Sequence, residues 1–290
     1  MNGPAAGPPA ADRPAPAGDL PTAEAVLPLL GDCPIGRPYT FVPTVDSTNL
    51  LLRRLAAEGA PEGTTVVADQ QTAGRGRRGR SWVSAPGSGI WMSVLLRPRL
   101  DPARWGLLAL AAAVAVRETA AAAGVDARIK WPNDLLVGDR KVCGILVEAG
   151  GAGPSRWAVV GIGLNVRPPA GGFPPEAAAA AVTLEEAAGR RVDRPALAAA
   201  LCRALARWYG VLESGRPEAV LDAWRSGASW LLGRRVQVLA GAAPDVLEGT
   251  VVDVAPDGGL IIATASGTRT LHAGDVSLRV DGAGAAGQQA

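Results

Sequence analysis

Three glycines and four arginines crowd into the segment from Gln71 to Arg80, whose sequence is QTAGRGRRGR. Glycine lets backbone N–H groups approach a bound anion, and arginine adds charge and bidentate hydrogen bonds. We therefore expect a flexible loop that binds an anionic ligand. Its basic residues are Arg75, Arg77, Arg78 and Arg80. Two other interpretations stay open for this segment alone: a nucleic-acid patch and a solvated basic loop.

The glycines at 74, 76 and 79 also match the dinucleotide-binding fingerprint as text. That fingerprint requires a helix that opens directly after the glycines. Here Ser81–Gly87 follows, with the sequence SWVSAPG, and then a strand pattern. The dinucleotide fold is therefore excluded. No Gly-Lys-Ser/Thr follows either, so a nucleotide site would not be a P-loop.

A second polar segment is Lys130–Asp134, with the sequence KWPND. Pro132 keeps the residue before it extended, and Asn133-Asp134 favours a turn. Binding residues are often displayed where a strand ends in a turn. The segment therefore suggests a binding role, although an ordinary strand end has the same pattern.

Lysine is rare in this chain: of 29 basic residues only Lys130 and Lys141 are lysines. Lys141 opens an apolar strand just after the tight turn at Gly138-Asp139. An ammonium at that point can reach a ligand while the strand fixes its origin. We expect these two positions to need what guanidinium cannot supply. Chance, and a solvated hairpin lysine, are the alternatives.

The segment Gly161–Val166, GIGLNV, alternates between two faces of a strand. Ile162, Leu164 and Val166 share one face, which belongs to the core. The other face carries Gly161, Gly163 and Asn165, so it is nearly bare backbone with one amide. A flat ligand could lie against it, although a close crossing of another element would also explain the glycines.

The chain has a single histidine, His272. It lies in the expected C-terminal barrel, where a histidine is more often a surface or core residue than a catalytic one. With one histidine we expect neither a Ser/His/Asp triad nor a histidine-based metal cluster. Chemistry must therefore rest on Arg, Lys, Asp and Asn, which suits charge stabilisation rather than proton shuttling.

Composition limits the class of protein. With 290 residues, 48% of them hydrophobic, the chain can bury a sizeable core, and its net charge of +2 argues against a surface devoted to nucleic acid. Three widely spaced cysteines predict no disulfide framework and favour a reducing compartment. The N-terminus lacks the features of a signal peptide, and the apolar run 107–116 is too short to span a bilayer. We expect a soluble, cytoplasmic protein.

Three regions follow from the patterns along the chain. Residues 1–25 are Pro/Ala-rich and are expected to be disordered and dispensable. Residues 38–228 mix strands and helices, and residues 232–281 show short strands and turns typical of a small β-barrel. Strands are expected at 39–42, 64–70, 89–96, 135–137, 141–148 and 156–166, and helices at 48–58 (capped by Ser47), 101–123, 193–213 and 217–225, with a loop at 167–180.

In this order, the segments resemble those of biotin–protein ligases. The resemblance extends from about Tyr39 to Val280 and rests on Ser47-Thr-Asn49, Gly74–Arg80, Lys130–Asp134, Arg140–Glu148 (RKVCGILVE) and Gly161–Val166. It implies an α/β (α+β) fold: a mixed-sheet catalytic domain resembling class II tRNA synthetases, and a small C-terminal β-barrel.

The resemblance also implies an activity. Such an enzyme activates biotin with ATP and Mg²⁺ to biotinyl-5′-AMP. It then attaches biotin to a lysine in the biotin carboxyl carrier protein domain of an acyl-CoA or pyruvate carboxylase. No specific DNA and no membrane are expected as partners.

Site residues carry over motif by motif. The biotin side would comprise Ser47, Thr48, Asn49, Gln71, Arg75, Gly76, Arg77 and Lys141, together with the bare strand face of Gly161 and Gly163. The ATP side would comprise Arg78, Arg80, Trp82, Lys130, Asn133, Asp134 and Asn165. Catalytic roles would fall to Lys141, Arg77 and Asp134, since cations must offset the repulsion between a carboxylate and a triphosphate.

The chain departs from this family at two points. Some relatives are also repressors, with a winged helix-turn-helix before the catalytic domain. Here 38 Pro/Ala-rich residues precede Tyr39, so we expect the monofunctional type without a DNA-binding domain. Some relatives also place an aromatic residue over the adenine just before Thr183-Leu184, where this chain has Ala181-Val182.

Two rival functions are weighed against this one. A lipoate–protein ligase would share the fold and the two-step chemistry, but the arginine-rich glycine loop favours biotin. A nucleic-acid-binding module would use the basic loop and the small barrel. It lacks aromatic residues interleaved with the arginines, beyond Trp82 and Trp91.

Overall fold

A seven-stranded mixed sheet forms the centre of the protein. The computed structural model describes residues 19–240, 246–272 and 276–280. The strands lie in the order β1-β2-β3-β7-β6-β5-β4, with β1 and β2 parallel and every other pair antiparallel. Their bounds are β1 Tyr39–Val45, β2 Thr65–Gln71, β3 Gly89–Leu96, β4 Arg128–Lys130, β5 Asp134–Val137, β6 Arg140–Gly150 and β7 Trp157–Asn165.

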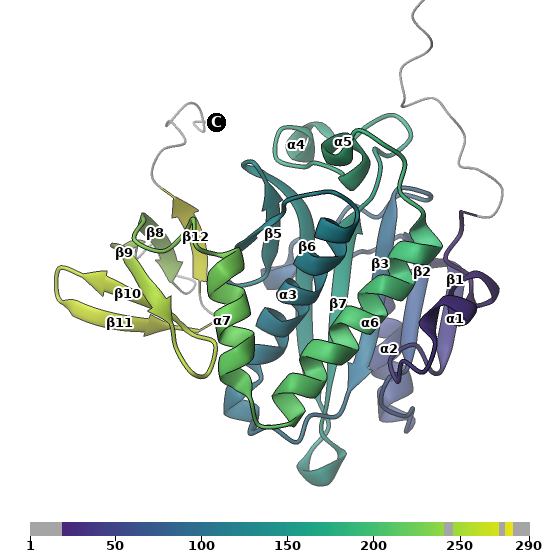
Figure 1. Cartoon of the computed structure of the whole chain (residues 1–290), viewed down its shortest axis with the longest axis horizontal. Coiled ribbons are helices and arrows are strands. Elements are labelled where there is room, and N and C mark those ends of the chain that lie inside the picture. Colours follow the sequence, from purple (N-terminus) through teal and green to yellow (C-terminus); the bar gives the residue numbers. More distant parts are fainter. Residues whose placement is uncertain (1–18, 241–245, 273–275, 281–290) are drawn as a thin grey trace, which may run out of the picture.

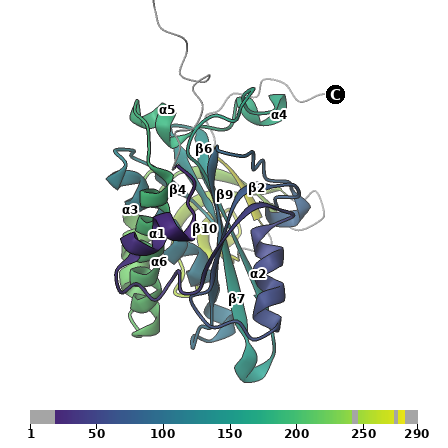
Figure 2. The ribbon, with the colours of Figure 1, turned by 90° about the vertical axis from the view of Figure 1, so that its right-hand side faces the viewer.

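Helices cover both faces of this sheet (Figures 1 and 2). On one face α3 packs against α6 and α7, and α1 packs against α6; α2 lies alone on the other face. The bounds are α1 Ala23–Leu30, α2 Thr48–Ala57, α3 Gly106–Ala122, α4 Pro175–Ala178, α5 Leu184–Ala188, α6 Arg194–Glu213 and α7 Pro217–Gly227. The mixed α/β architecture predicted from the sequence is confirmed.

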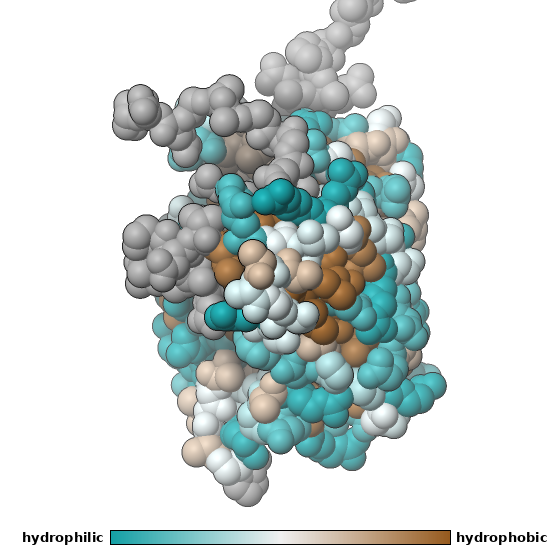
Figure 3. All heavy atoms as spheres, turned by 90° about the vertical axis from the view of Figure 1, so that its left-hand side faces the viewer, coloured by the Kyte–Doolittle hydropathy of each residue, from teal (hydrophilic) through white to brown (hydrophobic). Residues whose placement is uncertain are grey.

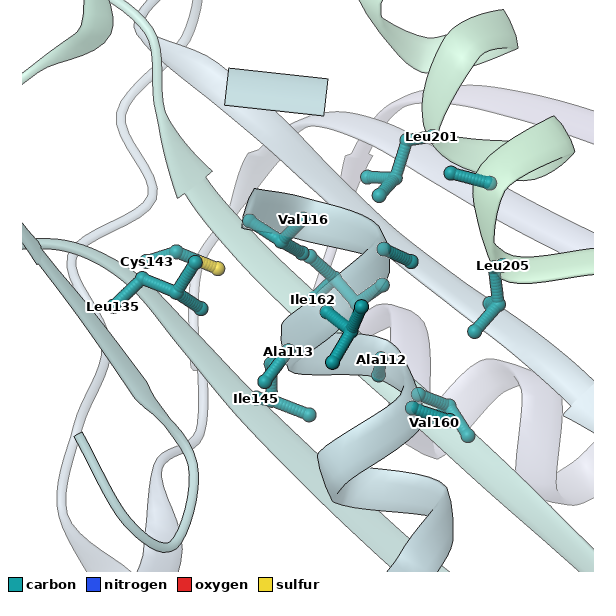
Figure 4. Close-up of a cluster of buried hydrophobic side chains, with 14 of the residues drawn as sticks. Ala112, Ala113, Val116, Leu135, Cys143, Ile145, Val160, Ile162, Leu201 and Leu205 are labelled. Atoms are coloured by element: carbon teal, nitrogen blue, oxygen red, sulfur yellow. The ribbon is translucent and has the colours of Figure 1, made fainter. Parts of the chain in front are cut away.

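The helix α3 is the centre of the larger core. Together with the 3₁₀ turn before it, the stretch Pro102–Ala122 is long and apolar enough to cross a membrane. However, 72% of its apolar 18-residue window is buried inside the protein. Its composition is therefore that of a core helix. In Figure 4 the side chains of Ala112, Ala113 and Val116 face those of Ile145 and Ile162 on the sheet.

Cys143 belongs to the same core. Its side chain is fully buried on β6 beside Leu135, and burial raises the pKa of its thiol. A thiol so buried and so weakly acidic is a small apolar residue rather than a nucleophile.

The C-terminal region forms a second sheet of five antiparallel strands, in the order β11-β10-β9-β8-β12. Its strands are β8 Arg235–Ala240, β9 Val246–Val254, β10 Leu260–Thr264, β11 Gly267–Leu271 and β12 Val276–Val280. Between the described residues of β11 and β12 no pairing closes this sheet, so the predicted barrel is wrong in that respect and the small all-β unit is right. Figure 3 views the molecule from the left-hand side of Figure 1. On this face hydrophobic residues gather near the middle, and most of the surrounding described surface is hydrophilic.

Three local predictions need correction. Ser47 does occupy the N-cap position of α2, but its side chain makes no capping hydrogen bond. The long helix predicted from residue 101 begins instead as a separate 3₁₀ turn, Pro102–Arg104, before α3. The predicted loop 167–180 contains the short helix α4. In the first two cases the helix was predicted and only its start differs, whereas α4 was not predicted.

The predicted disordered tail also extends too far. Residues 1–18 lie outside the described part of the chain, whereas Asp19 is buried and α1 begins at Ala23. The Asp19 carboxylate lies 2.5 Å from the Arg167 guanidinium and 3.0 Å from that of Arg194. Arg194 is fully buried and also contacts Asp69 on β2 at 2.8 Å. The segment that begins at Asp19 is therefore tied to the seven-stranded sheet.

This ion cluster predicts that Asp19→Asn destabilises the fold. Removing one partner leaves a buried guanidinium undercompensated, so we expect a loss of about 3 kcal/mol of unfolding free energy at neutral pH. Urea unfolding measures it. The control is Asp222→Asn, which removes an exposed carboxylate paired with Arg225 and should change stability by less than about 1 kcal/mol.

The unfolding free energies of the wild type and of Asp19→Asn should depend differently on pH. Burial alone would raise the pKa of Asp19, but Arg167 and Arg194 outweigh it and lower the pKa below its ordinary 3.8. The contribution of the carboxylate is then present above pH 3.8 and is lost as the pH falls through its folded value. The stability gap between wild type and Asp19→Asn should narrow below that pH. A gap that is absent at pH 7 would contradict the role of Asp19.

Candidate active site

One cavity of about 450 Å³ opens where β2, β5, β6 and β7 meet the loop after β2. Every residue that the sequence predicted for the site lines it. These are Ser47, Thr48, Asn49, Gln71, Arg75, Gly76, Arg77, Arg78, Arg80, Trp82, Lys130, Asn133, Asp134, Lys141, Gly161, Gly163 and Asn165. Segments that lie up to 118 residues apart therefore meet at one surface, from Ser47 to Asn165.

The floor of the cavity is the glycine face of β7. Ile162, Leu164 and Val166 are buried in the core, so the predicted alternation is confirmed. A Cβ on Gly161 would lie 2.1 Å from the Asn49 amide oxygen, and one on Gly163 would lie 2.4 Å from Nε1 of Trp82. Each glycine is required because a side chain, the Asn49 amide or the Trp82 indole, rests directly on the strand.

Trp82 packs against this floor. Its ring also approaches Gly144 on β6, where a Cβ would lie 3.0 Å from the indole. The indole N–H is buried and has no hydrogen-bond partner among the described residues. The ammonium of Lys141 lies 5.0 Å from the ring centroid, within range of a cation–π contact.

Lys141 stands at the centre of the site. Its Nζ lies 2.6 Å from Oδ1 of Asp134, and its side chain is 32% exposed. The Lys141 backbone also pairs with the segment before α5: its N–H donates to Ala180 O, and its carbonyl accepts from the Val182 N–H. The lysine is therefore held at both its backbone and its charged end.

The Lys130–Asp134 segment forms one wall. Burial lowers the pKa of Lys130, and Asp134 opposes that effect. Asn133 donates to Ile145 O at 2.8 Å and accepts from the Arg77 guanidinium at 3.2 Å. The turn is thus fixed to β6 on one side and to the arginine-rich loop on the other.

The arginine-rich loop is closed on itself. The backbone N–H of Trp82 donates to the backbone carbonyl of Gly74, and the backbone N–H of Gly76 donates to that of Arg80. Only the three-residue 3₁₀ turn Arg77–Gly79 follows the first glycines, which confirms that no dinucleotide-binding helix is present there. Within this turn Arg78 adopts a left-handed backbone with φ of 58°, a conformation that is costly for a residue other than glycine.

Asn165 faces the cavity, but its amide is already engaged. Its Nδ2 donates to Val182 O at 3.2 Å and lies 3.4 Å from Lys141 O. It thereby joins β7 to the segment that follows α4.

The charge of the cavity is strongly positive. Two carboxylates, from Asp134 and Glu176, line it against six basic side chains: Arg75, Arg77, Arg78, Arg80, Lys130 and Lys141. Such an excess in a partly enclosed site favours a ligand with several negative charges. Apolar lining residues, among them Met92, Ile145 and Phe173, leave room for an uncharged part of the same ligand.

Sequence reasoning missed several residues of the site. Phe173 and Glu176 line the cavity from the segment 167–180, which was predicted only as a loop. Ser93 and Glu148 lie beneath the cavity and hold its lining residues. A serine on a strand that is otherwise apolar, and a glutamate that ends an apolar strand, were the available signals.

The glycine floor predicts the effect of Gly163→Ala. Because the new methyl group would overlap the indole of Trp82, the ring must leave its seat while the backbone, which is extended there, is retained. We expect a shift of tryptophan emission that disappears in a Trp82→Phe background. The control is Gly210→Ala, at a helical position with open space around it, which should leave the emission unchanged. An equal shift in both backgrounds would show that Trp82 does not rest on Gly163.

Comparison with known proteins gives the same result for both parts of the chain. Residues 41–165 match the biotin/lipoate A/B protein ligase family, and residues 231–279 match the biotin protein ligase C-terminal domain. The chain is 35% identical to the biotin–[acetyl-CoA-carboxylase] ligase of Paracoccus denitrificans, over 80% of this chain and 96% of that protein. It is also 35% identical to the bifunctional ligase/repressor BirA of Bacillus spizizenii, over 84% of this chain and 75% of that protein.

Solved structures agree with the sequence comparisons. The biotin protein ligase of Aquifex aeolicus, in complex with biotin and ATP, superposes with a TM-score of 0.71 at 30% identity. The match covers 83% of this chain and 98% of that one. On these matches, and on a site that contains all the predicted residues, the chain belongs to the biotin protein ligase family.

Proposed function

We propose that this protein joins biotin to ATP and then transfers the biotinyl group to a carrier lysine. In the first step a carboxylate oxygen of biotin attacks the α-phosphorus of ATP, which forms biotinyl-5′-AMP and releases pyrophosphate. In the second step the lysine amine attacks the acyl carbon, which forms an amide and releases AMP. The observation that carries the proposal is the glycine-floored cavity ringed by six basic side chains.

The two substrates would divide the cavity between them. The biotin side comprises the start of α2, Gln71, the Arg75–Arg77 part of the loop, and the floor of Gly161 and Gly163. The ATP side comprises Arg78, Arg80, Trp82, Lys130, Asn133, Asp134 and Asn165. Lys141 lies between the two sides, beside Asp134 and Trp82.

Catalysis of the first step is a matter of charge and position. The attacking carboxylate is already ionised at neutral pH, so no general base is needed. The barrier comes from bringing two anions into contact, and fixed cations lower it. Lys141 and Arg77 are the groups we assign to that task.

The second step requires that the carrier lysine lose a proton. Asp134 is the carboxylate nearest to Lys141, and it would be the acceptor as the new amide forms. Glu176 is the other carboxylate that lines the cavity, and it lies on α4.

Mg²⁺ would accompany the triphosphate. A magnesium ion carried by nucleotide phosphates typically needs only one or two protein carboxylates, and Asp134 and Glu176 supply that number. When bound, the ion would neutralise phosphate charge and assist the departure of pyrophosphate. The protein's own residues still have to hold the biotin carboxylate.

The carrier that we propose is a biotin carboxyl carrier protein domain of an acyl-CoA or pyruvate carboxylase, in the cytoplasm. Its support is the name of the Paracoccus relative and the free state of Cys33, Cys143 and Cys202, which suits a reducing compartment. We expect neither a specific DNA site nor a membrane to be a partner.

Pyrophosphate exchange into ATP tests the first step and its substrate. We expect exchange that depends on biotin, and incorporation of biotin into a purified carboxyl carrier domain. Lipoate is the matched comparison, since it is also a carboxylic acid with a sulfur-containing ring. Exchange with lipoate and none with biotin would overturn the substrate assignment.

Lys141→Arg tests the role of the central lysine. The space around Nζ is bounded by Asp134, by Trp82 and by Gly144, where a Cβ would lie 3.2 Å away, so a wider guanidinium should displace the reacting oxygen. We expect the single-turnover rate of adenylate formation to fall about 10-fold or more. Lys141→Gln should lose at least as much.

Neither variant should unfold, because the ammonium is partly exposed, and thermal melts check this. Adenylate formation by Lys141→Arg at the wild-type rate would show that the compact ammonium is not required.

A further inference from the structure

The cavity segment, residues 168–182, leaves the sheet after β7 and ends just before α5, and both of its ends lie beside a buried ion cluster. It contributes Phe173, Glu176, Ala177, Ala180 and Ala181 to the lining. We propose that Arg167 and Glu185 form a clamp at the base of this segment, and that Asp19, which precedes the sheet in the chain, completes the clamp. The three are then positioning residues for the ATP side. The part of this inference that concerns ATP rests on the proposed function.

Backbone hydrogen bonds bring the two ends of the cavity segment together. Glu185 N–H donates to Val166 O at 2.9 Å, so the start of α5 is bonded to the residue that follows β7. Val182 N–H donates to Lys141 O at 3.0 Å, and Val182 O accepts from the Asn165 amide at 3.2 Å. The segment therefore leaves and rejoins the sheet at one place, beside a residue assigned to the ATP side.

The side chains of Arg167 and Glu185 join the same two ends. Nε and Nη2 of Arg167 lie 3.1 and 3.0 Å from one carboxylate oxygen of Glu185. That oxygen also accepts from the Val192 N–H at 3.0 Å, and Nη2 of Arg167 donates to Val192 O at 3.2 Å. The two side chains are only 10% and 11% exposed, so solvent and salt screen this ion pair weakly.

Asp19 holds the Arg167 guanidinium through a different nitrogen. Its carboxylate lies 2.5 Å from Nη1 of Arg167 and 3.0 Å from Nε of Arg194, which is fully buried. Two buried guanidinium groups repel each other unless a carboxylate lies between them. Without the charge of Asp19, we expect Arg167 to move away from Arg194 and its contact with Glu185 to loosen.

The clamp acts on the base of the cavity segment and leaves its course between the two ends open. Because the lining residues of the segment are attached to the sheet through these ends, a shift at the base moves all of them. Among the described residues, neither Arg167 nor Glu185 uses its side chain to bond the biotin side. Asp19 also reaches β2 through Arg194 and Asp69, so Glu185 is the cleaner position to test.

Glu185→Gln removes the charge and keeps the shape, and it tests the clamp without any substrate. Hydrogen–deuterium exchange followed by mass spectrometry measures opening at the base. We expect the amides of residues 182–192 to exchange about 10-fold faster, and those of α3 to exchange at the wild-type rate, because only the local opening becomes easier. Asp19→Asn should accelerate the same amides although it changes no atom of that region. Glu185→Asp keeps the charge and should recover part of the protection.

The matched control is Glu213→Gln. Glu213 is similarly shielded, with a side chain that is 12% exposed, and it pairs with Arg99 at 2.8 Å. Neither residue lines the cavity. The variant should leave the deuterium exchange of residues 182–192 unchanged. A general loss of stability would accelerate exchange in α3 as well, whereas the proposed role affects only the base of the cavity segment.

Enzyme kinetics test the consequence for ATP. In Glu185→Gln we expect the KM for ATP to rise about 10-fold while the KM for biotin changes less than about 2-fold, since the clamp supports one side of the cavity. Because the two side chains act through each other, the double variant Arg167→Gln/Glu185→Gln should have a KM for ATP no higher than that of Arg167→Gln alone. A merely structural role would lower the amount of active enzyme and leave both KM values unchanged.

Each part of the inference has a result that overturns it. Wild-type deuterium exchange of residues 182–192 in Glu185→Gln overturns the clamp, and wild-type exchange in Asp19→Asn overturns the part assigned to Asp19. A KM for ATP that is unchanged, or that rises no more than the KM for biotin, overturns the positioning role. A wild-type enzyme without biotin-dependent pyrophosphate exchange overturns the proposed function instead, and the deuterium exchange rates still decide whether the clamp exists.

Discussion

The repulsion between two anions is the constraint on which the rest of this structure depends. A carboxylate and a triphosphate must touch before they can react, and water keeps them apart. The protein meets this constraint by placing six basic side chains around a cavity with only two carboxylates in its lining. Fixed charges of this kind need no reorganisation during reaction, but they repel one another when the cavity is empty.

Much of the fold can be understood as a response to that repulsion. The lining arginines lie on a loop whose stems are tied by buried neutral groups and by Glu148, which is paired with Arg53 and Arg75. The two lysines come from strand ends, and Asp134 lies against Lys141. The sheet supplies what the loop lacks, which is a rigid floor without side chains. Gly161 and Gly163 let Asn49 and Trp82 rest directly on backbone.

Local patterns in the sequence predicted the parts of this arrangement that depend on local rules. The alternation in Gly161–Val166 assigned one face to the core and one to the cavity because a strand has a period of two. The predicted β3 has the bounds observed, 89–96, because a run of apolar residues between turn signals is buried on both faces. The family resemblance then brought together motifs that no local rule connects.

The remaining features depend on partners that are distant in the chain. In the sequence Asp19 belongs to a Pro/Ala-rich tail. It is buried because it contacts Arg167 and Arg194, which lie 148 and 175 residues further along the chain. Ser93 appeared as a lone polar residue in an apolar strand, and its role depends on Asn49. Whether the C-terminal sheet closes into a barrel depends on pairing between its two edge strands, β11 and β12. Turn signals in the sequence do not encode that pairing.

The C-terminal sheet shows how the site and the domain architecture share residues. Trp131, between Lys130 and Pro132, lines the cavity, yet its indole N–H donates to Gly258 O in the turn between β9 and β10. A Cβ on Gly106, at the start of α3, would lie 2.9 Å from Asp257 O in the same turn, so the turn approaches the core helix as closely as backbone allows. The wall that carries Lys130 and Asn133 therefore has the larger core on one side and the small sheet on the other. Because a buried indole N–H without a partner is costly, the small sheet completes that wall rather than merely following it in the chain.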